Sequence, residues 1–167
     1  MIVMGRGQHM HGGNRGQFAA PRPMIHHHGQ GADMQVEDSD AMMERVLIVD
    51  DHPLVRDGLR SVIAVSFDGC EIFEAASLEE ALATLEKQSN FDLVLLDLNI
   101  PDVKRLDGLK LLRSRHPILP VVMVSGAFDR GIVREALGAG AAGFIPKSMK
   151  RSAIVDALHR VVSGEIY

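Results

Sequence analysis

The sequence of 167 residues predicts an α/β fold built on one parallel sheet with helices on both faces. Short apolar runs recur along the chain, and each run is continuous rather than alternating, as in strands that are buried on both sides. Segments with the helical spacing of apolar residues lie between these runs. Strict alternation of strand and helix is typical of a parallel sheet with crossover helices.

The first half of the pattern contains three strands and two helices. The strands are predicted at residues 46–49, about 70–75 and 93–96. A helix over about 53–65 begins with Pro53, a residue that is suited to the first turn. A second helix follows Ser77, because Ser77 and Glu80 have the spacing of a capping box.

The second half continues the alternation with two strands and three helices. In chain order they are predicted at residues 107–115, 121–124, 129–137, 143–145 and 150–162. The first of these helices stops before Pro117, because the residue before a proline is pushed out of helical geometry. The next helix exits through Gly138 and Gly140, and glycine accepts a positive φ at such exits.

Five strands and five helices of this kind form one domain of ordinary size, and we expect the flavodoxin-like (βα)5 architecture. In this doubly wound parallel sheet the strand order is 2-1-3-4-5, so the second strand lies at an edge. That strand ends in the apolar pair Ala75-Ala76, whereas the other four strands end in polar groups. Ligands of such sheets bind beyond the carboxyl ends of the strands, so these polar groups should meet at one rim.

Three acidic residues are the most informative of these polar groups. Asp50 and Asp51 follow the first strand, and Asp97 follows the third. Taken alone, the pair could cap the next helix, and Asp97 could belong to an ordinary turn before Pro101. Together they predict a carboxylate pocket for a divalent cation such as Mg²⁺, which prefers oxygen ligands.

These acids, with Ser125 at the end of the fourth strand and Lys147 at the end of the fifth, resemble the motif of the receiver domain of bacterial two-component response regulators. The resemblance covers roughly residues 45–163. It is nearest to the branch that carries a LuxR/NarL/FixJ-type helix-turn-helix DNA-binding domain after the receiver. The loop that follows Asp97 is longer than usual, since Pro101 and Gly108 are seven positions apart.

The resemblance implies a role for each motif residue. Asp97 would accept a phosphoryl group, with Lys147 and Ser125 contacting the phosphoryl oxygens. Ser125 and Phe144 would move together as the switch. Mg²⁺ would be held by Asp50, Asp51, Asp97 and the backbone carbonyl of Asn99. His52, beside the acids, is interpreted as a capping or solvent-facing residue and is left out of the site.

The resemblance also implies partners. A sensor histidine kinase or phosphotransfer protein would donate the phosphoryl group, so the chain would be a phosphoacceptor switch rather than an enzyme. A homodimer through the fourth helix, fifth strand and fifth helix is expected, near Arg134, Phe144, Lys150 and Arg151. The tail through Glu44 holds 3 of the 18 basic and 5 of the 22 acidic residues, leaving 15 against 17. This balance predicts no nucleic-acid binding by the chain itself.

The domain organisation is predicted from composition. Residues 1–43 are rich in Gly, His and Met and are expected to be disordered, 44–163 form the receiver domain, and 164–167 begin an interdomain linker. No apolar run approaches the length of a membrane span, so we expect a cytoplasmic protein. The chain would be either a piece of a longer transcription regulator or a single-domain receiver that acts by protein contact.

Other classes of function stay open at this stage. A phosphatase of the haloacid-dehalogenase type also uses a strand-end aspartate with Mg²⁺, but it needs a second aspartate where this chain has Asn99. A receiver-like module that only binds would lack an acid or the lysine. Flavin binding is disfavoured, because aromatic residues that could stack on the flavin make up only 4% of the chain.

Overall fold

The computed structural model describes residues 42–167, so the prediction of a disordered tail over 1–43 lies almost wholly outside the described residues. The strands are β1 (Arg45–Val49), β2 (Glu71–Ala75), β3 (Leu93–Asp97), β4 (Val121–Ser125) and β5 (Gly143–Pro146). The helices are α1 (Pro53–Ser66), α2 (Leu78–Lys87), α3 (Asp107–Arg115), α4 (Arg130–Gly138) and α5 (Arg151–Val162). Every predicted element is present, with bounds that agree within one to two residues.

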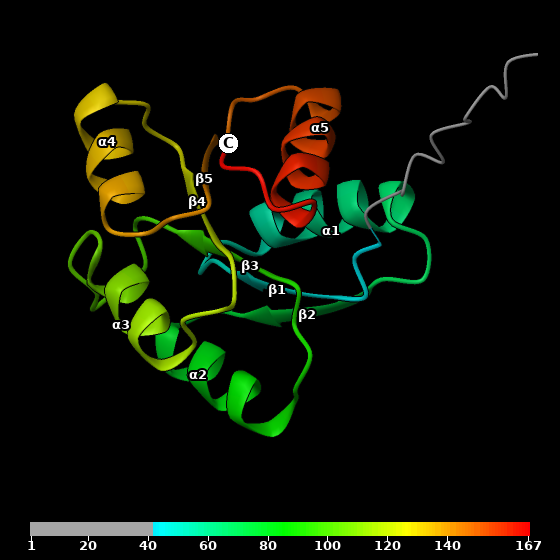
Figure 1. Ribbon diagram of the computed structural model, residues 1–167, viewed down its shortest axis with the longest axis horizontal. Coiled ribbons are helices and arrows are strands. Elements are labelled where there is room, and N and C mark those ends of the chain that lie inside the picture. Colours follow the sequence, from blue (N-terminus) through cyan, green and yellow to red (C-terminus); the bar gives the residue numbers. More distant parts are fainter. Residues whose placement is uncertain (1–41) are drawn as a thin grey trace, which may run out of the picture. The chain divides into compact units, whose positions relative to one another are not determined.

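The five strands form one parallel sheet in the order β2-β1-β3-β4-β5, which confirms the predicted topology. Helices α1 and α5 cover one face, and α2, α3 and α4 cover the other (Figure 1). Successive strand residues point to opposite faces: Leu47 packs on the side of α2 to α4, and Ile48 on the side of α1 and α5. The continuous apolar runs are thus explained by burial on both faces.

Helix starts follow the local signals in the sequence. Pro53 occupies the first turn of α1. The Ser77 hydroxyl accepts a hydrogen bond from the Glu80 backbone N–H at 3.1 Å, and the Glu80 carboxylate accepts one from the Ala76 N–H at 2.8 Å. The second bond reaches one residue further back than in a standard capping box. Gly140 has φ +93°, so a glycine serves the turn between α4 and β5 as predicted.

The last three residues return to the sheet and lie beside β5. The Tyr167 N–H donates to the Ala142 carbonyl at 3.0 Å, and the Phe144 N–H donates to the Tyr167 carbonyl at 3.2 Å. The Arg160 guanidinium lies 5.4 Å from the centre of the Tyr167 ring and pairs with Glu165 at 2.8 Å. This segment therefore covers part of the exposed edge of β5, which would otherwise leave backbone groups unpaired.

The long loop between β3 and α3 is anchored at its middle. Val103 packs against the core cluster on the side of α3, and its methyl group would lie 3.3 Å from a Cβ placed on Gly108. Asp102 and Arg105, on either side of this stretch, have positive φ values of 64° and 41°. The additional loop residues thus form a folded corner beside the carboxyl end of β3.

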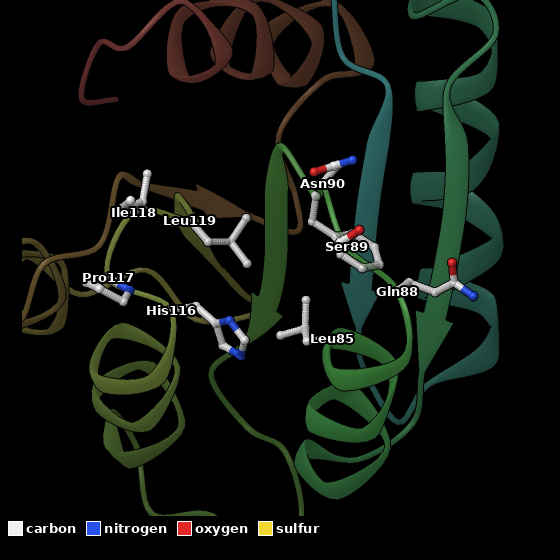
Figure 2. A pocket seen from close by; sticks show the side chains of 9 residues that line it. Leu85, Gln88, Ser89, Asn90, His116, Pro117, Ile118 and Leu119 are labelled. Carbon is white, nitrogen blue, oxygen red and sulfur yellow. The ribbon is translucent and has the colours of Figure 1, made fainter.

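One pocket lies at the amino ends of β3 and β4, away from the strand ends that carry the acids. Figure 2 shows its lining, which comes from the segments before these two strands: Leu85, Gln88, Ser89, Asn90, Phe91, His116, Pro117, Ile118 and Leu119. It contains no carboxylate and no lysine. Within residues 42–167, no helix has both the length and the apolar character needed to cross a membrane.

Candidate phosphoacceptor site

The carboxyl ends of β1, β3 and β4 bring three polar side chains into the protein interior. Asp50, Asp97 and Ser125 are 1%, 3% and 0% exposed, and they are the buried polar residues of the described chain. Asp50 follows β1, while Asp97 and Ser125 are the last residues of their strands. Burying two carboxylates costs free energy unless they are paired, so their presence here indicates a functional site.

Lys147, directly after β5, supplies the pairing charge. Its ammonium nitrogen lies 2.8 Å from Asp50 Oδ2 and 3.2 Å from Asp97 Oδ1. The lysine backbone is fixed as well, because its N–H donates to the Ser125 carbonyl at 2.7 Å. The predicted strand order led us to expect Lys147 close to these acids, because β5 lies beside β4 and the carboxyl ends of parallel strands reach the same edge of the sheet.

The two oxygens of Asp97 have different surroundings. Oδ1 accepts the Asn99 backbone N–H at 3.2 Å and lies near Lys147. Oδ2 is buried and accepts no hydrogen bond from any residue between 42 and 167. The backbone N–H of Asn99 thus holds this residue in the turn after β3, and the backbone of Asn99 lies next to the acidic pocket. An orphaned carboxylate oxygen in a buried site is the atom that a ligand would satisfy.

Electrostatics separate the two buried acids. Burial raises the pKa of Asp97, and the negative charge of Asp50 adds to this, so its pKa lies above the usual value although the Asn99 N–H and Lys147 oppose the shift. Burial also acts to raise the pKa of Asp50. There, the Lys147 ammonium and the backbone and side chain of His52 outweigh burial and hold the pKa below the usual value. Asp97 is therefore the less stable carboxylate.

The two predicted switch residues lie on neighbouring strands. The Ser125 hydroxyl oxygen accepts a hydrogen bond from the Ala127 N–H at 3.2 Å. Phe144 is buried, in the cluster that lies under α2, α3 and α4, and pairs in register with Met123 of β4. Ser125 is two residues beyond Met123, so both switch residues adjoin the same strand.

His52 is the N-cap residue of α1 by position, and its side chain lies beside both members of the acid pair. Its ring Nδ1 is 2.9 Å from Asp50 Oδ1 and 3.1 Å from Asp51 Oδ1, and the side chain makes no capping hydrogen bond to α1. The side-chain cap therefore does not form, whereas the 61% exposure of the side chain agrees with the solvent-facing interpretation. The contact with both acids was not predicted, because a residue after two acids can point either to the solvent or back over them.

The donor atoms fit a divalent cation. Asp50, Asp51, His52 and Asp97 each offer one ligand atom, and these atoms lie within 4.8 Å of one another. Three buried carboxylate oxygens, Asp50 Oδ2, Asp51 Oδ1 and Asp97 Oδ2, accept no hydrogen bond of regular geometry from the described residues. Lys147 lies 2.8 Å from the first and His52 Nδ1 lies 3.1 Å from the second, so Asp97 Oδ2 is the oxygen left without a charged or ring neighbour among them. Among residues 42–167, Lys147 is the one Lys or Arg side chain that pairs with Asp50 and Asp97, so a bound cation would relieve the remaining negative charge.

Comparison with known proteins identifies a family for the chain. Residues 46–159 match the model of the response regulator receiver domain. Among curated proteins, the chain is 43% identical over 125 residues to the glycerol metabolism activator of Pseudomonas putida, covering 75% of this chain and 57% of that protein. It is 33% identical over 121 residues to the nitrate/nitrite response regulator protein NarL of Escherichia coli K12, covering 72% and 56%. The chain thus spans somewhat more than half the length of these relatives.

Solved structures give the same result. A LuxR family DNA-binding response regulator from Silicibacter pomeroyi aligns with a TM-score of 0.66 at 37% identity, covering 74% of this chain and 94% of that one. A CheY-like response regulator receiver domain protein from Methanospirillum hungatei aligns at 0.64 and 26% identity, covering 72% and 94%. With the matched sheet order and the matched span of residues, the chain belongs to the response regulator receiver domain family.

Proposed function

We propose that the domain accepts a phosphoryl group on Asp97 from the phosphohistidine of a sensor kinase or phosphotransfer protein, and later releases it to water. In the first step a carboxylate oxygen forms a bond to phosphorus as the bond to the histidine nitrogen breaks. In the second step water attacks phosphorus, the bond between phosphorus and the Asp97 oxygen breaks, and inorganic phosphate and the free Asp97 carboxylate are formed. The observation that carries this proposal is the buried, unpaired Oδ2 of Asp97, in a carboxylate whose other oxygen lies 3.2 Å from the Lys147 ammonium.

The chain's own groups divide the work. Asp97 Oδ1 is held by the Asn99 N–H, which leaves Oδ2 as the oxygen that attacks. Lys147 offers positive charge to the equatorial oxygens, where negative charge spreads during phosphoryl transfer. The Ser125 hydroxyl accepts the Ala127 N–H and so keeps its own proton free to donate to a phosphoryl oxygen.

Asp50, Asp51, Asp97 and the Asn99 carbonyl would hold Mg²⁺, which would supply positive charge against the negative charge of the carboxylates and of the phosphoryl group. Two observations support this ligand set: the three carboxylates lie close together, and each has a buried oxygen without a regular hydrogen bond among the described residues. Asp50 already has Lys147 and His52 as neighbours. Its carboxylate would therefore orient groups around the site more than it would bind the cation directly.

Phosphorylation would act as a switch rather than as a turnover reaction. A new anion at Asp97 would draw the Ser125 hydroxyl toward it, and Phe144 would follow into the space beside β4. Ser125 and Phe144 would thus have two arrangements, and the negative charge of the phosphoryl group would favour one of them. Because Phe144 lies between β4 and the segment at Tyr167, such a movement would alter the edge formed by α4, β5 and α5.

The output would be control of transcription through a DNA-binding domain, acting in the cytoplasm. The relatives that support this are named as transcriptional activators, such as ExaE of Pseudomonas putida at 37% identity over 122 residues. A single-domain receiver that acts by protein contact is the alternative, and both share the chemistry at Asp97. The haloacid-dehalogenase mechanism is disfavoured, because Asn99 lies where that mechanism needs an acid.

The test is the intact mass of the protein after incubation with a small phosphodonor. We expect one added phosphoryl group in the presence of Mg²⁺, and none with a chelator or in Asp97→Asn. Continuous release of phosphate far beyond one equivalent would favour the phosphatase. Folded protein that gains no mass from the small donor or from any phosphorylated histidine protein would contradict the proposal.

A further inference from the structure

His52 lies over the acidic pocket without a role in the proposed chemistry. Its Nδ1 lies 2.9 Å from Asp50 Oδ1 and 3.1 Å from Asp51 Oδ1, so the imidazole spans both members of the acid pair. The His52 backbone N–H also donates to Asp50 Oδ1 at 2.9 Å, which fixes the chain at this point. The side chain is 61% exposed, so the ring forms the outer wall of a pocket whose floor is buried.

The position matches that of a ligand. Ligand atoms from Asp50, Asp51, His52 and Asp97 lie within 4.8 Å of one another, the spacing of groups that can share one ion. Asp97 Oδ2 is buried and lacks a hydrogen-bond donor among residues 42–167, which independently points to a ligand in this space. A cation bound there would face the imidazole as well as the carboxylates.

We propose that His52 is a nitrogen ligand of the cation site and shifts its preference from Mg²⁺ toward divalent transition metals, with Mn²⁺ as the accessible probe. The physical reason is ligand chemistry: carboxylate and carbonyl oxygens suit Mg²⁺, whereas an imidazole nitrogen favours first-row transition metals. The inference rests on the proposed function, because the same carboxylates would hold the ion. It adds an imidazole to the oxygen ligands of the proposed function.

A different role for His52 is possible on the same contacts, namely a hydrogen bond that only orients Asp50. The two roles differ in whether a His52 nitrogen is bonded directly to the metal. A ligand places a nitrogen nucleus in contact with the metal, whereas an orienting hydrogen bond leaves nitrogen one atom further away. The test therefore needs a spectroscopic signal from directly bound nitrogen.

Electron spin echo modulation of bound Mn²⁺ gives this signal, and the full chain should be used. Five tail histidines, which lie outside the described residues, are replaced by glutamine in every sample to remove competing nitrogens: His9, His11, His26, His27 and His28. The matched control is His116→Gln, because His116 lies in the pocket at the opposite ends of the strands (Figure 2). Asp51→Asn serves as the variant that should lose the ion.

We expect directly coordinated ¹⁴N in the parent and in His116→Gln, and its loss in His52→Gln. His52→Gln should lower the affinity for Mn²⁺ about tenfold or more, since even a partner outside the ligand shell contributes that much. It should lower the affinity for Mg²⁺ less, because Mg²⁺ prefers oxygen ligands, so the ratio of Mn²⁺ to Mg²⁺ affinity should fall. Unchanged circular dichroism would show that the variant is folded. Bound Mn²⁺ without ¹⁴N coupling would overturn the role of His52 and leave the carboxylate site intact. Absence of Mn²⁺ and Mg²⁺ binding in the parent would overturn both proposals.

Discussion

Asp50 and Asp97 lie 2.8 and 3.2 Å from the same ammonium group, yet their surroundings move the two pKa values in opposite directions. For Asp50, pairing with Lys147 and His52 outweighs burial and lowers the pKa. For Asp97, burial and the charge of Asp50 together raise it. One buried acid therefore contributes stability when ionised, and the other costs stability when ionised.

This difference predicts opposite effects of two isosteric substitutions in chelator at neutral pH. Asp50→Asn should lower the free energy of unfolding by roughly 1–3 kcal/mol, because a charge-assisted hydrogen bond is lost in a buried site. Asp97→Asn should raise it by about 1 kcal/mol, since the amide keeps an oxygen for the Asn99 N–H while a repelling charge is removed. Urea unfolding of the two variants and the parent measures both values.

The pH dependence follows from the same directions. The lowered pKa of Asp50 gives stability that is present above the unfolded value of 3.8 and is lost as pH falls through the folded pKa. The raised pKa of Asp97 gives a penalty that appears as pH rises from 3.8 through its folded pKa. Both variants should therefore approach the parent in strongly acidic solution. A destabilising effect of Asp97→Asn at neutral pH would contradict this account.

At the scale of elements, helices, strands and strand-end polar residues could be predicted from the sequence where apolar periodicity or the chemistry of the strand ends determines the structure. The strand with Val46 was found because burial on both faces demands a continuous apolar run. Asp97, Ser125 and Lys147 were found because parallel strands end at one rim. The docking of Tyr167 on β5 was not predicted, since a short terminal segment has no periodicity and its contacts depend on an edge that exists only after folding.

That terminal segment should stabilise the domain measurably. Tyr167→Ala removes the stacking of the ring with Arg160 and the contact of its hydroxyl with the Met149 sulfur at 3.8 Å. We expect a loss of about 1 kcal/mol, the size of one partly exposed cation–π contact together with some buried ring surface. Thermal unfolding by circular dichroism measures the change, with Tyr167→Phe as the control that keeps the ring. Equal stability of the alanine variant and the parent would show that the segment does not dock in solution.

At the scale of the whole molecule, the site and the expected output face are joined through β4 and β5. Arg134, Lys150 and Arg151 are exposed, and Phe144 is buried behind them. Arg151 also donates a hydrogen bond to the Ser61 carbonyl of α1 at 3.1 Å, so its guanidinium already has a partner within the domain. Sequence patterns could place these residues on elements but could not show which side chains are occupied elsewhere.

We expect dimerisation through the face formed by α4, β5 and α5 when the site carries a phosphoryl mimic. Sedimentation velocity should show a monomer alone, a dimer with Mg²⁺ and beryllium fluoride, and a monomer for Asp97→Asn under the same conditions. Arg134→Glu should weaken the dimer, because a charge of opposite sign on an interface disrupts its electrostatic complementarity. Identical sedimentation with and without the mimic would count against this face as a switched interface.

In the proposed function one carboxylate, Asp97, carries the phosphoryl group. Borohydride reduces an aspartyl phosphate to homoserine, so peptide mass spectrometry after phosphorylation and reduction identifies the modified position. We predict homoserine at position 97, dependent on Mg²⁺ during phosphorylation, and unmodified aspartate at positions 50 and 51. Homoserine at either of those positions, or phosphorylation that survives in Asp97→Asn, would contradict the account.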